Sequence, residues 1–307
     1  MASHHDADTV EIPAPAPRER RTPDVASTDV LVDLGGLSHP GNVRPNNEDH
    51  YLVARFDRVM RTVLTNLPPG NVPQHFAESA YGLVVADGVG GAAAGEVASR
   101  AAIATLVDLV LQAPYWILRP DEPLVKEVQG RAAQRFRDVG EALAARARAD
   151  PSLFSMATTL TLAASLGAEM VVTHVGDSRA YLFRQGRLLR LTRDHTLAQA
   201  LADHGAIRPE EVATHGLRHV LTNVIGAKGE EVKAELHHLR LEHGDQVLLC
   251  TDGLTDMATD AEVAQVLGRS GPAAAACDAL VDLALAGGGR DNVTVVLARY
   301  HIADGPG

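Results

Sequence analysis

Four aspartates in this sequence lie where a short apolar segment meets a turn, and together they could bind metal ions. Asp87, Asp177 and Asp252 each follow such a segment, and Asp291 precedes one. Any one of them alone is better explained as a turn residue, because Asp and Gly are common in turns. Carboxylates from several strand ends would repel one another at a shared edge unless a cation neutralised them. Oxygen ligands of this kind suit Mg²⁺ or Mn²⁺.

A second polar group lies upstream, in the segment 44–49. Arg44 carries a planar guanidinium that can bind a phosphate through two parallel hydrogen bonds. Glu48 and Asp49 could coordinate a metal ion or orient its water ligands. Taken alone, the segment is better explained as a solvated polar loop, so its interpretation depends on the four aspartates.

The strands and helices that would position these residues follow from the apolar pattern. Short apolar runs between turn residues predict strands at 51–54, 81–86, 158–165, 170–175, 180–183, 188–191, 246–250 and 293–300. Apolar residues at helical spacing predict helices at 93–112, about 123–149, 260–267 and 272–286. Strands joined by tight turns, with the helices in separate blocks, favour an α+β fold of antiparallel sheets covered by helices.

The remaining segments predict one domain with a tail. Residues 1–28 are rich in Pro and Ala and can bury little, so a disordered tail is expected. The domain is expected at 29–303, followed by a short tail at 304–307. Within the domain, residues of about 201–235 mix His, Gly and Arg with short apolar pieces and predict an irregular subdomain, whereas the long connection at 55–80 has no assigned role.

Composition narrows the class of protein and of partner. The hydrophobic fraction is 46%, enough for a sizeable core, and the net charge is −11. An acidic chain is a poor partner for nucleic acid, which is bound by clustered Lys and Arg. No apolar run is long enough to span a membrane and the first ten residues do not resemble a signal peptide, so a cytoplasmic protein without a membrane partner is expected. The cysteines Cys250 and Cys277 form no CxxC motif, so dithiol redox chemistry is not supported.

The ordered set of polar motifs resembles the metal-dependent protein phosphatase family, the type 2C serine/threonine phosphatases. The matching stretches fall in the family's order: 44–49, 86–91, 158–159, 176–181, 192–195, 251–254 and 289–292. Each motif alone is weak, whereas the ordered set is specific and covers nearly all of the chain after the tail. Segment 215–226 is similar to the flap of bacterial members, and residues 201–235 are therefore named the flap.

The resemblance implies a four-layer αββα sandwich, in which two central antiparallel sheets are flanked by helices. It implies that two Mn²⁺ or Mg²⁺ ions bind in a cleft at one sheet edge. In bacterial members a third ion binds as well. Seven residues would form the metal site: Asp87 bridging two ions, the Gly88 carbonyl, Asp252, Asp291, Asp177 for the third ion, and Glu48 and Asp49 at or just outside the coordination shell. Arg44 would bind the substrate phosphate, and the catalytic residues would be Arg44, Asp87 and Asp252.

The resemblance also implies the reaction, which is hydrolysis of phosphoserine and phosphothreonine in proteins. The partners would be phosphorylated proteins, among them a bacterial serine/threonine kinase and its substrates. A water bridging two cations would lose its proton near neutral pH and attack phosphorus in line with the leaving oxygen. Val89 stands where some members have a histidine proposed as general acid, so protonation of the leaving group stays unassigned. The alternative is a catalytically weak relative that binds phosphoproteins as a regulator.

Two other enzyme classes fit the sequence less well. Segment 88–90 with Ala93 matches the loose dinucleotide-binding pattern, but Asp87 would then lie against the pyrophosphate. Residues 6–10 match the short pattern of an aspartyl-nucleophile phosphatase of the haloacid-dehalogenase type, but they lie in the expected tail without a preceding strand.

Two histidines near the aspartates could suggest a metal role, but both have a more ordinary explanation. His174 lies in an apolar segment and is predicted to be a core or cross-strand residue, because the other candidate ligands are oxygens that suit hard cations. His195 follows Asp194 at a predicted helix start, where helix capping is the usual role.

Overall fold

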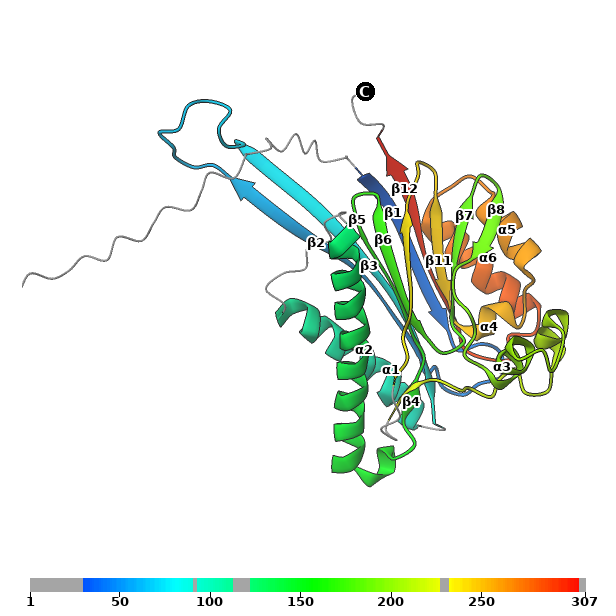
Figure 1. The fold of residues 1–307 in the computed structure, drawn as a ribbon. Coiled ribbons are helices and arrows are strands. Elements are labelled where there is room, and N and C mark those ends of the chain that lie inside the picture. Colours follow the sequence, from blue (N-terminus) through cyan, green and yellow to red (C-terminus); the bar gives the residue numbers. More distant parts are fainter. Residues whose placement is uncertain (1–29, 91–92, 113–121, 227–231, 304–307) are drawn as a thin grey trace, which may run out of the picture.

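Two antiparallel β-sheets lie at the centre of the molecule (Figure 1). The computed structural model describes residues 30–90, 93–112, 122–226 and 232–303. Among these residues the first sheet has five strands, in the spatial order β1 (Val30–His39), β12 (Val293–Ile302), β11 (Gln246–Cys250), β7 (Arg179–Arg184) and β8 (Arg187–Arg190). Strands β7 and β8 form the hairpin that the sequence predicts.

The second sheet has seven strands in the described part of the chain. Six follow the order β10 (Glu235–Arg240), β6 (Glu169–Val175), β5 (Leu160–Leu166), β3 (His75–Val89), β4 (Ala157–Thr158) and β9 (Ile225–Gly226). The seventh, β2 (Asp49–Arg61), pairs with β3. Each of these pairings is antiparallel, which excludes the doubly wound parallel sheet of a dinucleotide-binding enzyme.

Side chains of alternating direction along β3 bury both faces of the second sheet. Leu83 and Val85 point into a core between the two sheets, where they join Val296 of β12. Val84 and Ala86 point the other way, into a second core beneath the helices. A strand that is buried on both faces explains why the sequence here is a continuous apolar run instead of an alternating one.

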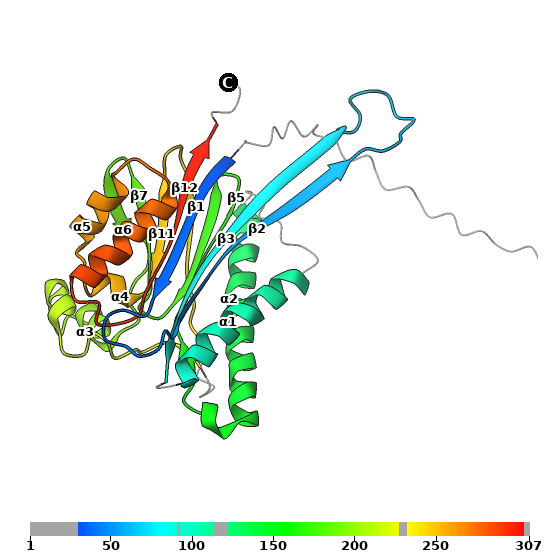
Figure 2. The ribbon, with the colours of Figure 1, turned by 180° about the vertical axis from the view of Figure 1, so that it is seen from behind.

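Helices cover the outer faces of both sheets (Figures 1 and 2). The second sheet is covered by α1 (Ala93–Gln112) and α2 (Glu122–Ala149), and the first by α4 (Asp252–Thr255), α5 (Asp260–Leu267) and α6 (Ala273–Ala286). The resulting helix–sheet–sheet–helix order confirms the predicted four-layer sandwich. None of the helices in the described ranges is both long and apolar enough to cross a membrane.

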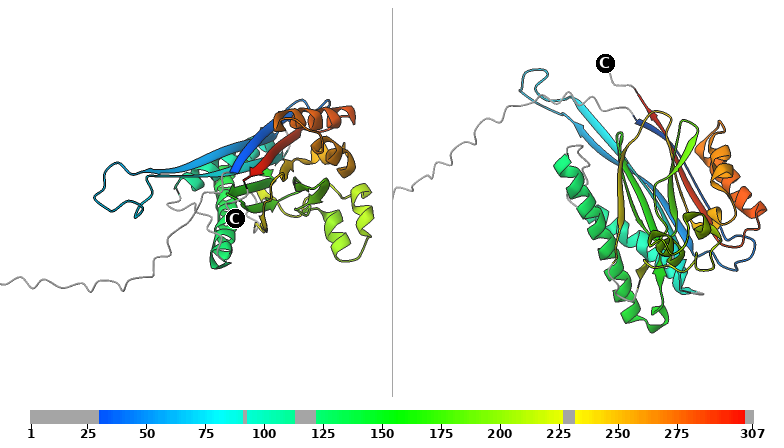
Figure 3. Two further views of the ribbon diagram at one scale, coloured as in Figure 1. Left: turned by 90° about the horizontal axis from the view of Figure 1, so that it is seen from above. Right: turned by 45° about the vertical axis from the view of Figure 1, so that its right-hand side comes forward.

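The connection expected at 55–80 is shorter than predicted, because residues 55–61 belong to β2 and residues 75–80 to β3, which together form a long β-ribbon. Strands β2 and β3 pair continuously from Asp49 opposite Asp87 to Arg61 opposite His75. The outer part of the ribbon extends away from the body of the molecule (Figures 1 and 3). From residue 57 onward every residue of β2 is exposed, so burial leaves no apolar pattern there and backbone pairing alone defines the strand.

Three further expectations need correction. Strand β1 was not predicted, because Gly35 and Gly36 interrupt its apolar pattern; a Cβ on Gly35 would overlap the backbone of α6, so the glycine permits close packing. Strand β10 was missed because it is a polar edge strand. Within the flap the described residues are more regular than expected, with the end of α3 (Leu197–Asp203), the 3₁₀ helix η2 (Pro209–Thr214) and β9.

The cap of α3 is Thr196, whose hydroxyl accepts a hydrogen bond from the Gln199 amide, so the prediction of capping by Asp194 or His195 is wrong.

Another short 3₁₀ helix, η1 (Pro151–Leu153), follows α2. The tails at 1–28 and 304–307 lie outside the described residues, and the domain limits stay predictions.

Candidate functional site

A polar cleft of about 650 Å³ lies at one end of the sandwich, where loops of both sheets meet. Seven of the eight residues predicted to form the site line this cleft: Arg44, Glu48, Asp87, Gly88, Asp177, Asp252 and Asp291. They come from the β1–β2 loop, the end of β3, the β6–β7 turn, the start of α4 and the turn before β12. The fold therefore brings together residues that lie up to about 250 positions apart in the sequence.

Three of the aspartates lie close enough to share a cation. One carboxylate oxygen from each of Asp87, Asp177 and Asp252 lies within 4.8 Å of the other two. Asp87 is inside β3 and not after it, as the sequence suggested, and it lies directly opposite Asp49 of β2. Directly opposed residues project to the same side of a sheet, so these two carboxylates are neighbours as well.

Asp49, the eighth residue, lies beneath the cleft and is only 4% exposed. Its Oδ2 accepts a hydrogen bond of 2.8 Å from the Thr251 hydroxyl, whereas its Oδ1 is buried and has no hydrogen-bond partner among the described residues. Burial raises the pKa of Asp49 to about 7. A buried carboxylate oxygen without a donor is costly, and a cation or its water ligand would satisfy it.

The raised pKa values of the other aspartates also indicate a cation site. Burial and the nearby Asp49, Asp252 and Asp177 raise the pKa of Asp87 well above its ordinary value. Burial and the neighbouring carboxylates also raise the pKa of Asp252 strongly, and that of Asp177 to about 7. Several aspartates that are hard to ionise together, and that offer carboxylate oxygens, fit hard divalent cations such as Mn²⁺ or Mg²⁺.

Arg44 and Asp291 form an ion pair at the mouth of the cleft. The guanidinium Nη2 lies 2.6 Å from the Asp291 Oδ2, and both side chains are more than one third exposed. The hydrogen bond to Asp291 raises the pKa of Arg44. Because both side chains are exposed, this pair contributes little stability and can open at low cost. A cation at Asp291 and a phosphate at Arg44 would each compete with it.

Two threonines that the sequence reasoning did not assign hold Asp87 in place. The Thr159 amide donates to the Asp87 carbonyl at 2.9 Å, and the Thr159 hydroxyl accepts from the Asp87 amide at 3.0 Å. The Thr158 hydroxyl donates to the same carbonyl at 2.8 Å. Thr159 also hydrogen-bonds Ser178, next to Asp177, at 2.8 Å. The threonine pair therefore links β3 at Asp87 with the turn that carries Asp177.

Asn292 holds the β1–β2 loop in place by hydrogen bonds. Its Nδ2 donates to the carbonyls of Pro40 and Asn46, and its Oδ1 accepts from the Glu48 amide at 2.8 Å. Asn292 is the sequence neighbour of the predicted ligand Asp291, and that adjacency is the signal by which the sequence could have identified it. Thr158 and Thr159 adjoin no predicted ligand and lie 71 and 72 positions from Asp87.

A comparison with protein families identifies the chain. The model for "Protein phosphatase 2C" matches residues 74–284, which hold most of the cleft. The chain belongs to the protein phosphatase 2C family. The resemblance drawn from the motifs is thereby confirmed.

Curated and solved members of the protein phosphatase 2C family give the same result. The serine/threonine protein phosphatase PstP of Mycobacterium tuberculosis is 39% identical over 216 residues, which is 70% of this chain but 40% of PstP. The serine/threonine phosphatase Stp of Listeria monocytogenes is 31% identical over 72% of this chain and 84% of its own length. The catalytic domain of PstP, solved in complex with two manganese ions, is 34% identical, with a TM-score of 0.68 over 89% of this chain and 99% of that chain. The chain thus spans about two fifths of the length of PstP.

The cleft of this family member also holds residues that the sequence reasoning did not select. Arg218 and His219 of the flap, Asp256 of the segment after α4, and Arg290 line it. The ring of His219 lies over two carboxylates, with Nδ1 3.8 Å from the Asp252 Oδ2 and Nε2 3.4 Å from the Asp256 Oδ2. Val89 is 38% exposed at the rim and offers no proton donor.

Gly95→Ala is expected to lower activity strongly, because Gly95 lets the start of α1 approach the cleft. A Cβ on Gly95 would overlap the carboxylate of Glu48 and crowd the Gly88 carbonyl. Displacing either group by about 1 Å can reduce turnover by about a hundredfold. The measurement is Mn²⁺-dependent hydrolysis of a phosphothreonine peptide. Gly130→Ala on α2 is the matched control, because its Cβ would meet nothing within 4 Å, and it should keep full activity. Normal activity of Gly95→Ala would contradict the tight approach.

Proposed function

We propose that this chain hydrolyses phosphoserine and phosphothreonine in proteins, with Mn²⁺ or Mg²⁺ as its cofactor. The observation that carries the proposal is the meeting of Asp87, Asp177 and Asp252 oxygens within 4.8 Å in an open polar cleft. Membership of the protein phosphatase 2C family and the two manganese ions bound to the PstP catalytic domain support it.

The roles proposed for the acidic residues are those that the family resemblance implies. Asp87, the Gly88 carbonyl, Asp252 and Asp291 would hold two ions, and Asp177 with Asp252 would hold a third. Glu48, at the end of the β1–β2 loop, and the buried Asp49, at the start of β2, would orient water ligands. When bound, the cations supply an acidic water as nucleophile and positive charge for the phosphoryl oxygens.

Arg44 would bind the substrate phosphate at the mouth of the cleft. Its guanidinium already points into the cleft toward Asp291, and it stays charged at every relevant pH. On substrate binding the guanidinium would turn from the carboxylate to two phosphoryl oxygens, which its planar fork matches. Arg218 and Arg290 also line the cleft and add positive charge around the phosphate.

The partners we propose are a bacterial serine/threonine kinase and the proteins it phosphorylates, because the relatives are bacterial serine/threonine phosphatases. We place this signalling role in the cytoplasm. The two cysteines of the chain are both buried and free, which supports a reducing compartment.

Chelation should abolish the activity of the purified chain on phosphopeptides. Phosphoserine, phosphothreonine and phosphotyrosine peptides are compared side by side with Mn²⁺, with Mg²⁺ and with excess EDTA, and released phosphate is measured. We expect turnover of the phosphoserine and phosphothreonine peptides with either cation, loss of turnover in EDTA, and recovery when Mn²⁺ is added back. The phosphotyrosine peptide should be a poor substrate.

The same peptides, with a binding titration added to the turnover assay, separate the proposal from its alternative. Turnover that survives complete chelation would exclude the metal-dependent mechanism. Saturable binding of the phosphopeptides without any turnover would instead favour a catalytically weak regulator that binds phosphoproteins.

A further inference from the structure

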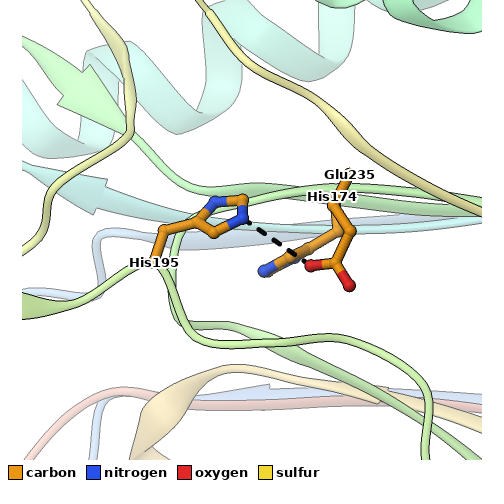
Figure 4. A group of neighbouring side chains, drawn as sticks. All are labelled: His174, His195 and Glu235. Atoms are coloured by element: carbon orange, nitrogen blue, oxygen red, sulfur yellow. Dashed lines mark ion pairs between the residues drawn. The ribbon is translucent and has the colours of Figure 1, made fainter. Parts of the chain in front are cut away.

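Two histidines and a glutamate meet beside the turn that carries Asp177. His174 comes from β6, His195 from the loop before α3, and Glu235 from the start of β10. Figure 4 shows the three side chains converging, with the His195 Nε2 3.6 Å from the Glu235 Oε2. One ligand atom from each lies within 4.8 Å of the others, a spacing that a metal ion could bridge.

The hydrogen bonds of His174 argue against a metal at this cluster. Its Nε2 lies 3.0 Å from the Gly176 carbonyl and 3.1 Å from the Arg193 carbonyl, so Nε2 must carry the proton. Its Nδ1 then accepts from the Thr161 hydroxyl at 2.8 Å. Burial lowers the pKa of His174 to about 4, which keeps the ring neutral at neutral pH. Both ring nitrogens therefore form hydrogen bonds within the protein, and His174 has a structural role.

His195 contacts the backbone immediately before Asp177. The His195 Nδ1 accepts a hydrogen bond of 3.1 Å from the Gly176 amide, and the His195 amide donates to the Gly176 carbonyl at 2.7 Å. Gly176 itself has a φ of +114° and packs so closely on Thr159 that a Cβ would overlap that side chain. The direction in which the chain enters Asp177 is therefore fixed by His195 on one side and Thr159 on the other.

The same ring nitrogen contacts the flap. The Asn223 Nδ2 lies 3.1 Å from the His195 Nδ1 and also donates to the Lys233 carbonyl at 2.7 Å. Neighbouring backbone bonds join the two segments, from the Thr222 amide to the His195 carbonyl at 2.8 Å and from the Leu197 amide to the Val220 carbonyl at 2.7 Å. The joined part of the flap directly follows Arg218 and His219, which line the cleft.

We propose that His195 is a positioning residue that couples the flap to the Asp177 turn through its Nδ1. The lone pair of this one acceptor atom is shared by a donor from each of the two parts, so the position of the ring constrains both parts together. Glu235 orients the ring, because Nδ1 is free to accept only when Nε2 carries the proton that faces the Glu235 carboxylate. The consequence for turnover rests on the proposed function, whereas the coupling itself does not.

Two substitutions separate the Nδ1 acceptor from the rest of the ring. In His195→Asn the amide oxygen can occupy the place of Nδ1 and accept both hydrogen bonds. In His195→Gln the amide lies nearer the place of Nε2, so the Nδ1 acceptor is lost. Asn223→Leu removes the donor from the flap side and leaves His195 intact. His238→Asn is the matched control, because His238 also pairs with a glutamate, Glu169, at 2.8 Å, on an edge strand outside the cleft.

The first measurement is hydrogen–deuterium exchange of the metal-free protein without substrate. We expect His195→Gln to speed exchange by about tenfold, both at the turn 175–178 and at residues 220–223. Asn223→Leu should speed exchange at the same two places, although it alters only the flap. His195→Asn and His238→Asn should leave both segments as in the wild type, and the melting temperature of each variant shows that it is folded.

The second measurement is turnover of a phosphothreonine peptide with Mn²⁺. His195→Gln should lower kcat/KM by about tenfold to a hundredfold, and His195→Asn should retain most of it. Unchanged exchange at both segments in a folded His195→Gln would overturn the proposal, as would equal damage in the Asn and Gln variants. If the wild type hydrolysed no phosphopeptide, the proposed function would fail, and the exchange experiment would still decide the coupling.

Discussion

Asp252→Asn is expected to abolish turnover and at the same time to stabilise the metal-free protein at pH 8. Asparagine keeps the size of the side chain but removes the negative charge that would hold two cations. A loss of about a hundredfold to a thousandfold or more in kcat is expected, comparable to the loss of a group that stabilises transition-state charge. The measurement is hydrolysis of a phosphothreonine peptide at saturating Mn²⁺.

The gain in stability follows from the pKa of Asp252, which burial and the nearby Asp177, Asp256 and Asp291 raise well above the value of 3.8 in an unfolded chain. Between those two pKa values the folded protein holds a proton that the unfolded chain has lost. The free energy of unfolding therefore falls as the pH rises through this window. Asparagine has no such proton, so the variant should be about as stable as the wild type at pH 4 and at least about 2 kcal/mol more stable at pH 8.

Urea unfolding in EDTA at pH 4 and pH 8 checks the second half of this prediction. The matched control is Asp278→Asn, which replaces an exposed aspartate of α6. It should change neither the activity nor the difference in stability between pH 4 and pH 8. A variant that is inactive but no more stable at pH 8 would show that Asp252 is already ionised and paired in the metal-free protein. A fully active variant would remove Asp252 from the metal site.

The sequence predicts the buried part of this fold well, because burial is what leaves a periodic pattern. The bounds of α1, α5 and β11 agree with the structure to the residue, and each contributes to a buried core. The prediction fails where burial does not decide the structure. The outer half of β2 is exposed on both faces, and β10 is a polar edge strand. Backbone hydrogen bonds hold such strands, and they leave little trace in residue type.

The candidate site, too, could be predicted only in part from the sequence. Asp87, Asp177 and Asp252 could be selected from the sequence because each adjoins an apolar segment and a turn, and their meeting follows from the sandwich. The sequence could not reveal that Arg44 pairs with Asp291, because that contact spans 247 positions. Nor could it select His219, whose place over the carboxylates depends on how the flap folds back on the cleft.

Removal of metal is expected to reverse the pH dependence of stability. In EDTA the wild type should lose stability as the pH rises from about 5 to 8, because burial raises the pKa of Asp49 and of Asp177 to about 7 and also raises the pKa values of Asp87 and Asp252 well above 3.8. Folding therefore takes up protons above pH 3.8, and this uptake becomes costlier as the pH rises. Cations bind the ionised carboxylates, so the stabilisation by Mn²⁺ should grow over the same range.

Two histidines oppose this trend and are outweighed. Burial lowers the pKa of His174 to about 4 from the ordinary 6.5 and also lowers the pKa of His50, so the contribution of each to stability rises with pH up to about 6.5. Two histidines act against four carboxyl groups, and above about pH 6.5 they no longer contribute to the slope. The decisive window is therefore pH 6.5 to 8, where only the carboxyl groups of this set still change their proton binding between the folded and unfolded states.

Melting temperatures at pH 5, 6, 7 and 8, with EDTA and with saturating Mn²⁺, measure both slopes. Calorimetric titration of Mn²⁺ in two buffers of different ionisation enthalpy measures the protons that leave on binding, and we expect more than one at pH 6. A flat or rising stability in EDTA between pH 6.5 and 8, or metal binding without proton release, would mean that the carboxyl groups are ionised without a cation. The cluster would then be stabilised by some other positive charge, and the cleft would have no electrostatic need for a metal.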